Sequence, residues 1–198
     1  MHTRKVSSCV AAIAVLLASA GCAFNPQTAN ITPTVSVMSS SDGKGVSVAV
    51  RVSDERPSKS LGRRGTGYGA AAEITAAQNI AAVVQKEIVA GLNKKGFAAM
   101  DGEGKANARL SVEVRLLEYS TSQGFWTGGV NVKGALKAVA TRNGQTYEKM
   151  YRTDKEERVV VVPTAETNEK WINDALSEVL RQLLDDSGLV MFLTKENG

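Results

Sequence analysis

The sequence contains little of the chemistry on which common enzyme classes depend. Among its 198 residues are one histidine and two cysteines, and His2 and Cys9 both lie within the first 21 positions. If that stretch is removed on export, the mature chain has no imidazole, and its single thiol belongs to Cys22. This excludes Ser-His-Asp and Cys-His nucleophile systems and His- or Cys-based zinc and copper sites. Carboxylate chemistry, a Ser-Lys dyad or an oxygen-ligand calcium site would remain, but no cofactor or metal ligand set is indicated.

The apolar stretch near the N-terminus is too short to cross a membrane. Val10–Ala18 holds nine residues, whereas a membrane-spanning helix needs about 20. Arg4 and Lys5 precede the stretch and small residues follow it, which is the layout of an export signal. We therefore expect residues 1–21 to be a signal peptide.

The end of this signal can be processed in two ways. Ala18–Ala20 fits an ordinary signal peptidase site, which would give a soluble periplasmic protein cleaved after Ala20. Alternatively, Ser19–Cys22 resembles a bacterial lipobox, in which Cys22 is lipidated. A lone exposed thiol is a liability in an oxidising compartment, so an acylated Cys22 is the better explanation. Because Ala23 follows, rather than the aspartate that marks inner-membrane retention, we expect a lipid-anchored, periplasm-facing protein of the outer membrane.

The mature chain has no strong charge of either sign. Without Arg4 and Lys5, the 24 basic residues fall to 22, against 20 acidic ones. No block of lysine and arginine indicates a nucleic-acid footprint, and export weakens that interpretation further. We expect the partners to be the membrane, through the N-terminal lipid, and an envelope protein or an anionic envelope polymer.

The rest of the chain reads as an anchor followed by one domain. Residues 22–43 are polar and predict a lipid anchor and tether, with a short strand at Val35–Met38, and residues 44–198 predict a single domain. Apolar periods of two and of 3.6 residues distinguish its strands from its helices. The expected strands are 46–52, 97–100, 109–119, 130–142 and 145–162, and the expected helices are 73–95 and 165–186.

This order of elements predicts an α+β fold with a mainly antiparallel sheet and two amphipathic helices packed on one face. Asn143-Gly144 is the favoured pair for a two-residue hairpin, and Gly188 is expected to stop the last helix. In the strand 109–119, Leu110, Val112, Val114 and Leu116 are expected to face the core. Such a sheet can leave its other face and an edge strand free for a partner.

A glycine-rich stretch, "LGRRGTGYGA" at 61–70, is the first candidate site. It lacks the Gly-Lys-Ser/Thr of a phosphate-binding loop and the spacing of a dinucleotide fingerprint. If it leads into a helix, Arg63, Arg64, Gly65 and Gly67 could bind an anion through guanidinium groups and backbone amides. The alternative is a flexible connector.

Two further candidates each have a structural alternative. Phe125 and Trp126 lie in a glycine-bounded loop, where they would form an aromatic contact patch if exposed, or cap the core if buried. Asp54 and Arg56 end a strand, where they could form a functional pair, although a local salt bridge is the commoner outcome.

Two carboxylate pairs could in principle supply a general acid and base. They are Asp101 with Glu103 and Glu113 with Glu118. The first pair lies in a glycine-flanked turn, and alternation places Glu113 on the solvated face of a strand. Neither position favours catalysis.

Several of these features, in this order, resemble the YajG-like family of Gram-negative lipoproteins. They are the lipobox-like signal, the Thr/Pro-containing tether, the strand ending in Asp54–Arg56, the "GLNKKGF" turn at Gly91–Phe97, the Asn143-Gly144 hairpin and the C-terminal amphipathic helix. The resemblance covers most of residues 15–195. It implies an outer-membrane lipoprotein without an established enzymatic activity.

We therefore expect a non-catalytic binding or assembly role at the outer membrane. The alternatives are a carboxylate-dependent enzyme acting on cell-wall glycan and a transport accessory that handles lipid. Converging buried carboxylates would favour the enzyme, an apolar groove would favour the lipid carrier, and an unblocked edge strand would favour assembly.

Overall fold

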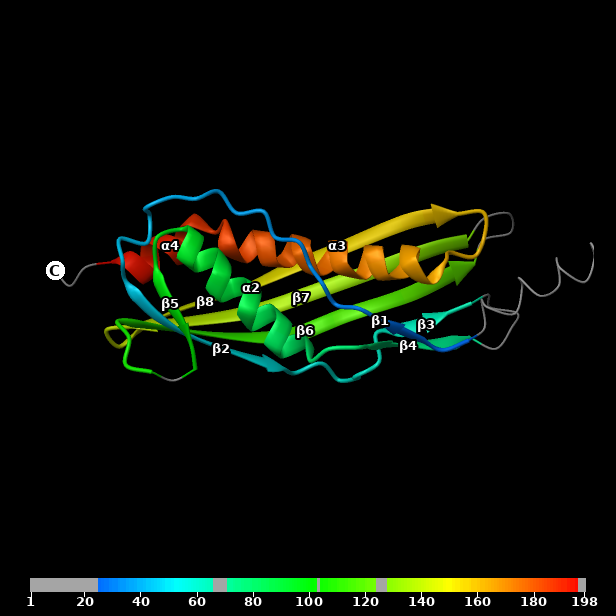
Figure 1. The fold of residues 1–198 in the computed structure, drawn as a ribbon, viewed down its shortest axis with the longest axis horizontal. Coiled ribbons are helices and arrows are strands. Elements are labelled where there is room, and N and C mark those ends of the chain that lie inside the picture. Colours follow the sequence, from blue (N-terminus) through cyan, green and yellow to red (C-terminus); the bar gives the residue numbers. More distant parts are fainter. Residues whose placement is uncertain (1–24, 66–70, 103, 124–127, 196–198) are drawn as a thin grey trace, which may run out of the picture.

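The structure is a computed structural model that describes residues 25–65, 71–102, 104–123 and 128–195. In these residues a mixed sheet of eight strands carries three helices on one face (Figure 1). This confirms the α+β class and the packing of helices on one face. The expectation of a mainly antiparallel sheet is partly wrong, because parallel pairs join β1 to β4, β2 to β5, and β6 to both β2 and β3.

Three long antiparallel strands form the centre and one edge of the sheet. They are β6 (Ala108–Gln123), β7 (Gly128–Arg142) and β8 (Gln145–Val159). Asn143 and Gly144 join β7 to β8 with φ angles of 51° and 75°. Both angles have the positive sign that a type I′ turn requires, so the sequence-based prediction of this hairpin is confirmed.

The other edge of β6 is shared by two groups of short strands. Along the first half of β6 lies β2 (Ser47–Asp54), with β5 (Ala98–Asp101) outside it. Near Tyr119 lies β3 (Gly62–Arg64), followed outward by β4 (Ala72–Ala76) and β1 (Gln27–Ala29). Residues 55–61 connect β2 to β3 and cross the space between the two groups.

The first helix begins later than the sequence pattern predicts. α2 spans Ile80–Lys94, whereas a helix was expected from residue 73. The residues 72–76 form β4 instead, because Ala72 and Ile74 are buried on one side of an alternating strand pattern while Glu73 is exposed on the other. Asn79 fixes the helix start, since its side-chain oxygen accepts a hydrogen bond from the Ala82 amide at 3.0 Å.

The C-terminal segment forms two helices rather than one. α3 spans Ala165–Leu184, and α4 spans Ser187–Thr194. Gly188 does not stop the first helix as expected. Asp186 begins a new helix there, and its carboxylate accepts a hydrogen bond from the Gly188 amide at 3.0 Å.

A β-bulge in β6 shifts the inward-facing residues. The pairing with β7 changes between Val114 and Leu116, so Arg115 is an extra residue on this strand. Before the bulge Val114 is fully buried, and after it Leu117 is buried while Leu116 is only half-buried. The expectation that Leu116 faces the core is therefore wrong, because the bulge inverts the alternation beyond it.

Residues 27–37 belong to the folded body, although we expected them in the tether. We call residues 30–34 the strap, because this extended segment runs along α3. The amides of every second strap residue donate to α3 side chains one turn apart: Asn30 to Glu169 Oε2 at 2.8 Å, Thr32 to Asn173 Oδ1 at 2.8 Å, and Thr34 to Ser177 Oγ at 2.9 Å. Residues 35–38 form no strand.

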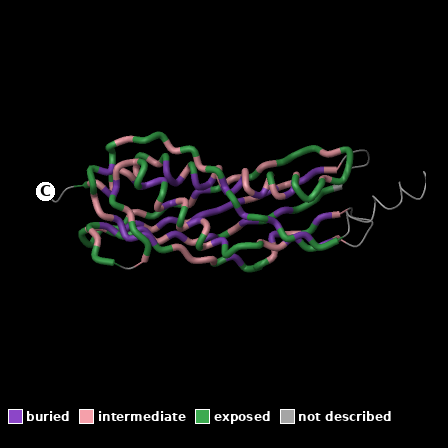
Figure 2. The backbone as a smooth tube through the Cα atoms, in the orientation of Figure 1, coloured by how far each residue is buried: buried purple, intermediate pink, exposed green. Residues whose placement is uncertain are grey.

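The core lies between the helices and the sheet, where the buried residues form a continuous band (Figure 2). The α3 stripe Ala175, Leu176, Val179, Leu180 and Leu183 is buried as expected, while Trp171 is partly buried at its edge. Within the described residues, no helix is both long and apolar enough to span a membrane.

Candidate functional site

A groove opens where the sheet divides into its two groups of short strands. Its volume is about 630 Å³. The lining residues come from the connection between β2 and β3, from the two short strands beyond it, and from β6 just after the bulge: Arg56, Pro57, Ser58, Ser60, Gly62, Arg63, Glu73, Leu116, Leu117 and Glu118. The bulge helps to form this groove, because it turns Leu116 and Glu118 away from the core.

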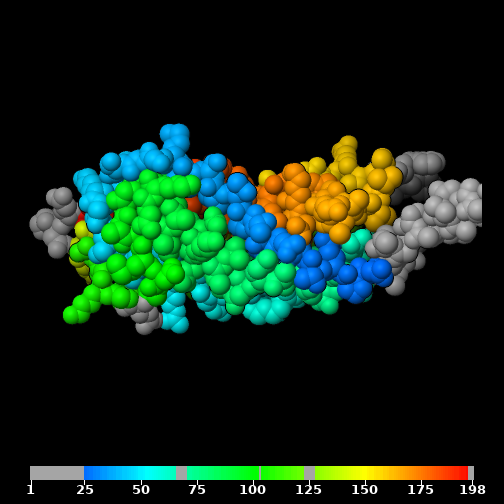
Figure 3. Space-filling model, in the orientation of Figure 1, coloured from blue at the N-terminus to red at the C-terminus, as the bar shows by residue number. Residues whose placement is uncertain are grey.

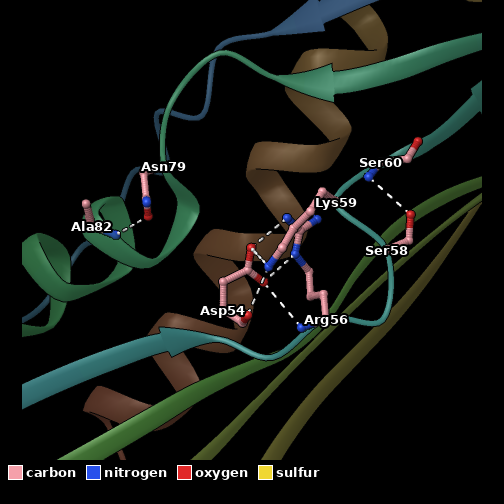
Figure 4. Close-up of polar contacts among 7 residues, drawn as sticks. All are labelled: Asp54, Arg56, Ser58, Lys59, Ser60, Asn79 and Ala82. Carbon is pink, nitrogen blue, oxygen red and sulfur yellow. Dashed lines mark hydrogen bonds and ion pairs between the residues drawn. The ribbon is translucent and has the colours of Figure 1, made fainter.

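The wall of the groove is held by an ion-pair cluster at the end of β2 (Figure 4). Arg56 donates two hydrogen bonds to the Asp54 carboxylate, from Nε at 2.8 Å and from Nη2 at 3.0 Å. Lys59 lies 3.1 Å from the same carboxylate and also donates to the Asp54 carbonyl oxygen at 3.0 Å. This cluster folds the chain back on itself immediately after the strand.

The electrostatics of this cluster indicate a structural ion pair rather than a titrating one. Partial burial raises the pKa of Asp54, but hydrogen bonds from Arg56 and Lys59 outweigh it and lower the pKa to about 2. The carboxylate is therefore ionised at neutral pH and is not a proton donor. The Arg56 side chain is only 4% exposed, so the two residues are a largely buried local salt bridge.

The remaining charges around the groove are mixed in sign. Arg63, Glu73 and Glu118 are exposed. They alternate with buried neighbours of the same strands, so they lie on the face of the sheet opposite the helices. The Arg63 guanidinium donates to the Ala71 carbonyl oxygen from Nη2 at 2.8 Å. The groove thus offers one arginine and two carboxylates to a ligand.

The structure places the two arginines of the expected anion site on opposite sides of β3. The stretch after Arg64 leads into β4 and not into a helix, so the expectation of backbone amides at a helix N-terminus is wrong there. Arg63 lines the groove, whereas Arg64 is only 7% exposed and faces the core. Gly65 is described, with φ of 124°, and Gly67 lies outside the described residues.

Arg64 belongs to a buried polar cluster that the sequence analysis missed. Gln27 Oε1 accepts hydrogen bonds from Arg64 Nη1 at 3.2 Å and from Asn168 Nδ2 at 3.1 Å. Asn168 Oδ1 accepts from the Tyr119 hydroxyl at 2.7 Å, and the Gln27 amide donates to the Ala165 carbonyl at 2.7 Å. Burial raises the pKa of Tyr119 to about 12, so its hydroxyl remains a donor. The cluster joins β1, β3, β6 and α3.

The two carboxylate pairs do not form a catalytic arrangement among the described residues. Glu113 is bound by Arg115 at 3.2 Å on the outer face of the sheet. Glu118 is paired in the ladder with Lys133. Asp101 ends β5, and Glu103 lies outside the described residues. In the part of the chain that the structure describes, no group of three His, Cys, Asp or Glu side chains could hold a metal ion.

Besides Gly67 and Glu103, the predicted site residues Cys22, Phe125 and Trp126 lie outside the described residues. The structure instead exposes another apolar feature that the sequence analysis treated as the end of a strand. Val160, Val161 and Val162 follow β8, and their exposed fractions are 84%, 74% and 38%. Four consecutive valines before a proline were the available signal.

This fold and groove define a class of protein: an α+β fold with a divided mixed sheet and helices on one face. The chain belongs to a family described as uncharacterized lipoprotein, which it matches over residues 33–194. No curated protein matches the sequence.

Two solved structures to which this chain is similar have low sequence identity to it. Protein XCC0632 from Xanthomonas campestris, of the family DUF330, is 17% identical with a TM-score of 0.55, and the match covers 81% of this chain and 95% of that one. Lipoprotein GNA1162 from Neisseria meningitidis is 15% identical with a TM-score of 0.25, covering 71% and 99%. At such identities the first likeness supports the fold alone.

Proposed function

We propose that this lipoprotein is anchored through Cys22 to the outer membrane, faces the periplasm and has a non-catalytic binding or assembly role. Membership of a lipoprotein family and the lipobox-like Ser19–Cys22 support the anchor. We further propose that the chain belongs to the YajG-like group, because its motifs, in their order, resemble those of that group. The role itself is proposed from the shape of the sheet.

The observation that carries the proposed role is the unpaired edge of β8. This strand is 15 residues long and pairs with β7 only. No other described strand lies on its far side, so its outward backbone groups can accept a strand from a partner. Its exposed side chains include Glu148, Arg152, Asp154 and Arg158. Because charges on an edge strand oppose unspecific pairing, they favour a partner with complementary charges.

Site-specific crosslinking tests this edge. With a photoreactive amino acid at Arg152, we expect one discrete adduct in intact envelopes, because the side chain is exposed on the strand that forms this edge of the sheet. The matched control is Lys86, an exposed residue on α2. The mass of the adduct distinguishes a second copy of the chain from another envelope protein. Absence of an adduct at Arg152, or the same adducts from Lys86, would contradict the role of β8.

An anionic envelope polymer is the second proposed partner, and Arg63 is the residue that could contact it. Arg63→Ala is expected to weaken binding to purified lipopolysaccharide, and to change the free energy of unfolding by less than about 0.5 kcal/mol, as is usual for an exposed side chain. Arg64→Ala is expected to lower that free energy by about 1–3 kcal/mol, because it removes a buried side chain and the charged one of the two donors to Gln27 Oε1.

Urea denaturation of both variants measures the difference in stability. Equal stability of the two would contradict the structural role of Arg64, and unchanged lipopolysaccharide binding by Arg63→Ala would remove the proposed anion contact.

The two alternative functions, a cell-wall glycan enzyme and a lipid-handling accessory, predict different activities. A cell-wall glycan enzyme would degrade purified peptidoglycan, and replacing Glu113 or Glu118 would abolish the turnover. Such turnover would overturn the non-catalytic proposal. A lipid-handling accessory would extract labelled phospholipid from vesicles into solution.

A further inference from the structure

Three consecutive valines are exposed at one end of the molecule. We call Val160–Val162 the valine tip. Val159 packs against the core, but Val160 and Val161 remain 84% and 74% exposed. A run of exposed apolar residues is unfavourable in water and is normally kept only where it contacts something.

The valine tip lies beside the point where the chain enters the fold. The Gln27 side-chain amide, on β1, donates to the Ala165 carbonyl oxygen at 2.7 Å. Ala165 follows Val162 by only three positions in the sequence, so β1 lies near the valine tip. Figures 1 and 3 show the first described residues, in blue, and the connection from β8 to α3, in gold, at the same end of the molecule. α4 lies at the opposite end (Figure 1).

The chain length available to the anchor keeps this end near the membrane. Cys22 is five residues before Gln27. At about 3.3–3.6 Å per residue, the connection spans at most about 18 Å. The polar layer on each side of a bilayer's hydrocarbon core is about 5–8 Å thick. A lipidated Cys22 therefore keeps β1, and with it the valine tip, close enough to reach the bilayer surface.

We propose that the valine tip inserts into the interfacial region of the phospholipid bilayer that holds the Cys22 acyl chains. This proposal rests on the proposed lipidation of Cys22. Valine side chains gain free energy on leaving water, and each adds to the attachment provided by the lipid. Arg158 and Glu166 are exposed on either side of the tip, and their charges limit the contact to the interface. Two contacts with the bilayer fix the orientation of the domain, whereas a lipid alone would let it swivel.

The test uses the full-length lipidated protein in vesicles of phosphatidylethanolamine and phosphatidylglycerol. A spin label is attached at Val161→Cys, since acylation consumes the thiol of Cys22. The matched control is a label at Met191→Cys, because Met191 is 66% exposed on α4, at the far end of the molecule. Accessibility of each label to oxygen, which concentrates in lipid, is compared with accessibility to a water-soluble nickel complex.

We expect the oxygen-to-nickel accessibility ratio at position 161 to rise several-fold on reconstitution, with no change at position 191. If the protein floats with the vesicles while the label at 161 stays in water, the tip proposal is overturned and the anchor stands. If the label at 161 is shielded from both reagents, a protein covers the tip, and the bilayer proposal is again overturned. If the protein does not float with the vesicles, the anchor and the tip proposal fail together.

Discussion

Cys22→Ala is expected to move nearly all of the protein from the membrane fraction to the soluble periplasmic fraction. Buried acyl chains contribute about 0.8 kcal/mol per methylene group to membrane attachment. No helix in the described part of the chain could replace that attachment by spanning the bilayer. Three valines at an interface bind far more weakly than acyl chains, so the valine tip alone does not retain the variant. Flotation of cell envelopes on a density gradient, followed by immunoblotting, measures the distribution.

Cys9→Ala is the matched control, because this cysteine lies within the expected signal peptide. It should leave the protein in the membrane fraction with the same mature mass. Retention of Cys22→Ala on membranes would contradict the lipid anchor. A wild-type protein found in the soluble fraction, beginning at Gly21, would instead support ordinary cleavage after Ala20.

Gly62→Ala is expected to destabilise the protein more than any surface change, by at least about 4 kcal/mol. Gly62 has a φ of 132°, and a β-carbon at this position would lie 1.8 Å from the Tyr119 carbonyl oxygen. Because the obstructing atom belongs to the backbone of β6, no side-chain rotation relieves the overlap. We expect β3 to separate from β6, with loss of the buried cluster around Gln27. Urea denaturation and the yield of folded protein measure the effect.

Gly102→Ala is the matched control, because it introduces backbone strain without a steric clash. Gly102 also has a positive φ, of 88°, but a β-carbon there meets nothing within 4 Å. We therefore expect only the cost of a left-handed conformation, about 1–2 kcal/mol. If both variants lost the same free energy of unfolding, the close approach of β3 to β6 would contribute nothing to the effect of Gly62→Ala.

The sequence predicts those parts of the fold that depend on local pattern. Asn143-Gly144 is sufficient for the hairpin because both residues tolerate positive φ. The α3 stripe is recognisable because apolar residues recur at three- and four-residue spacing from Ile172 to Leu184. The segment 72–76 is misassigned because Ile74 is buried in the strand as it would be in a helix. The bulge in β6 has no local signal and is fixed by pairing with β7.

The candidate site was predictable only where its members are neighbours in sequence. Asp54 and Arg56 are two residues apart, and their salt bridge follows from the turn that joins them. By contrast, Gln27 and Asn168 are separated by 141 positions. Arg64 has the same sequence context as exposed Arg63, and the alternation of β3 alone places one inside and the other outside. Such placement requires the strand to be recognised first.

The strap along α3 has a built-in limit on its length. Two extended residues advance about 6.6 Å and four helical residues advance about 6.0 Å, so each further step adds a mismatch of about 0.6 Å. The hydrogen-bonding positions of the strap and of the helix therefore match over a few steps only, and then fall out of register. The two repeats match from Asn30 to Thr34, where every second amide finds an acceptor on α3. One residue inserted between these positions would shift every later strap amide out of line with its acceptor on α3. The same insertion before Gln27 would only lengthen the connection to the anchor.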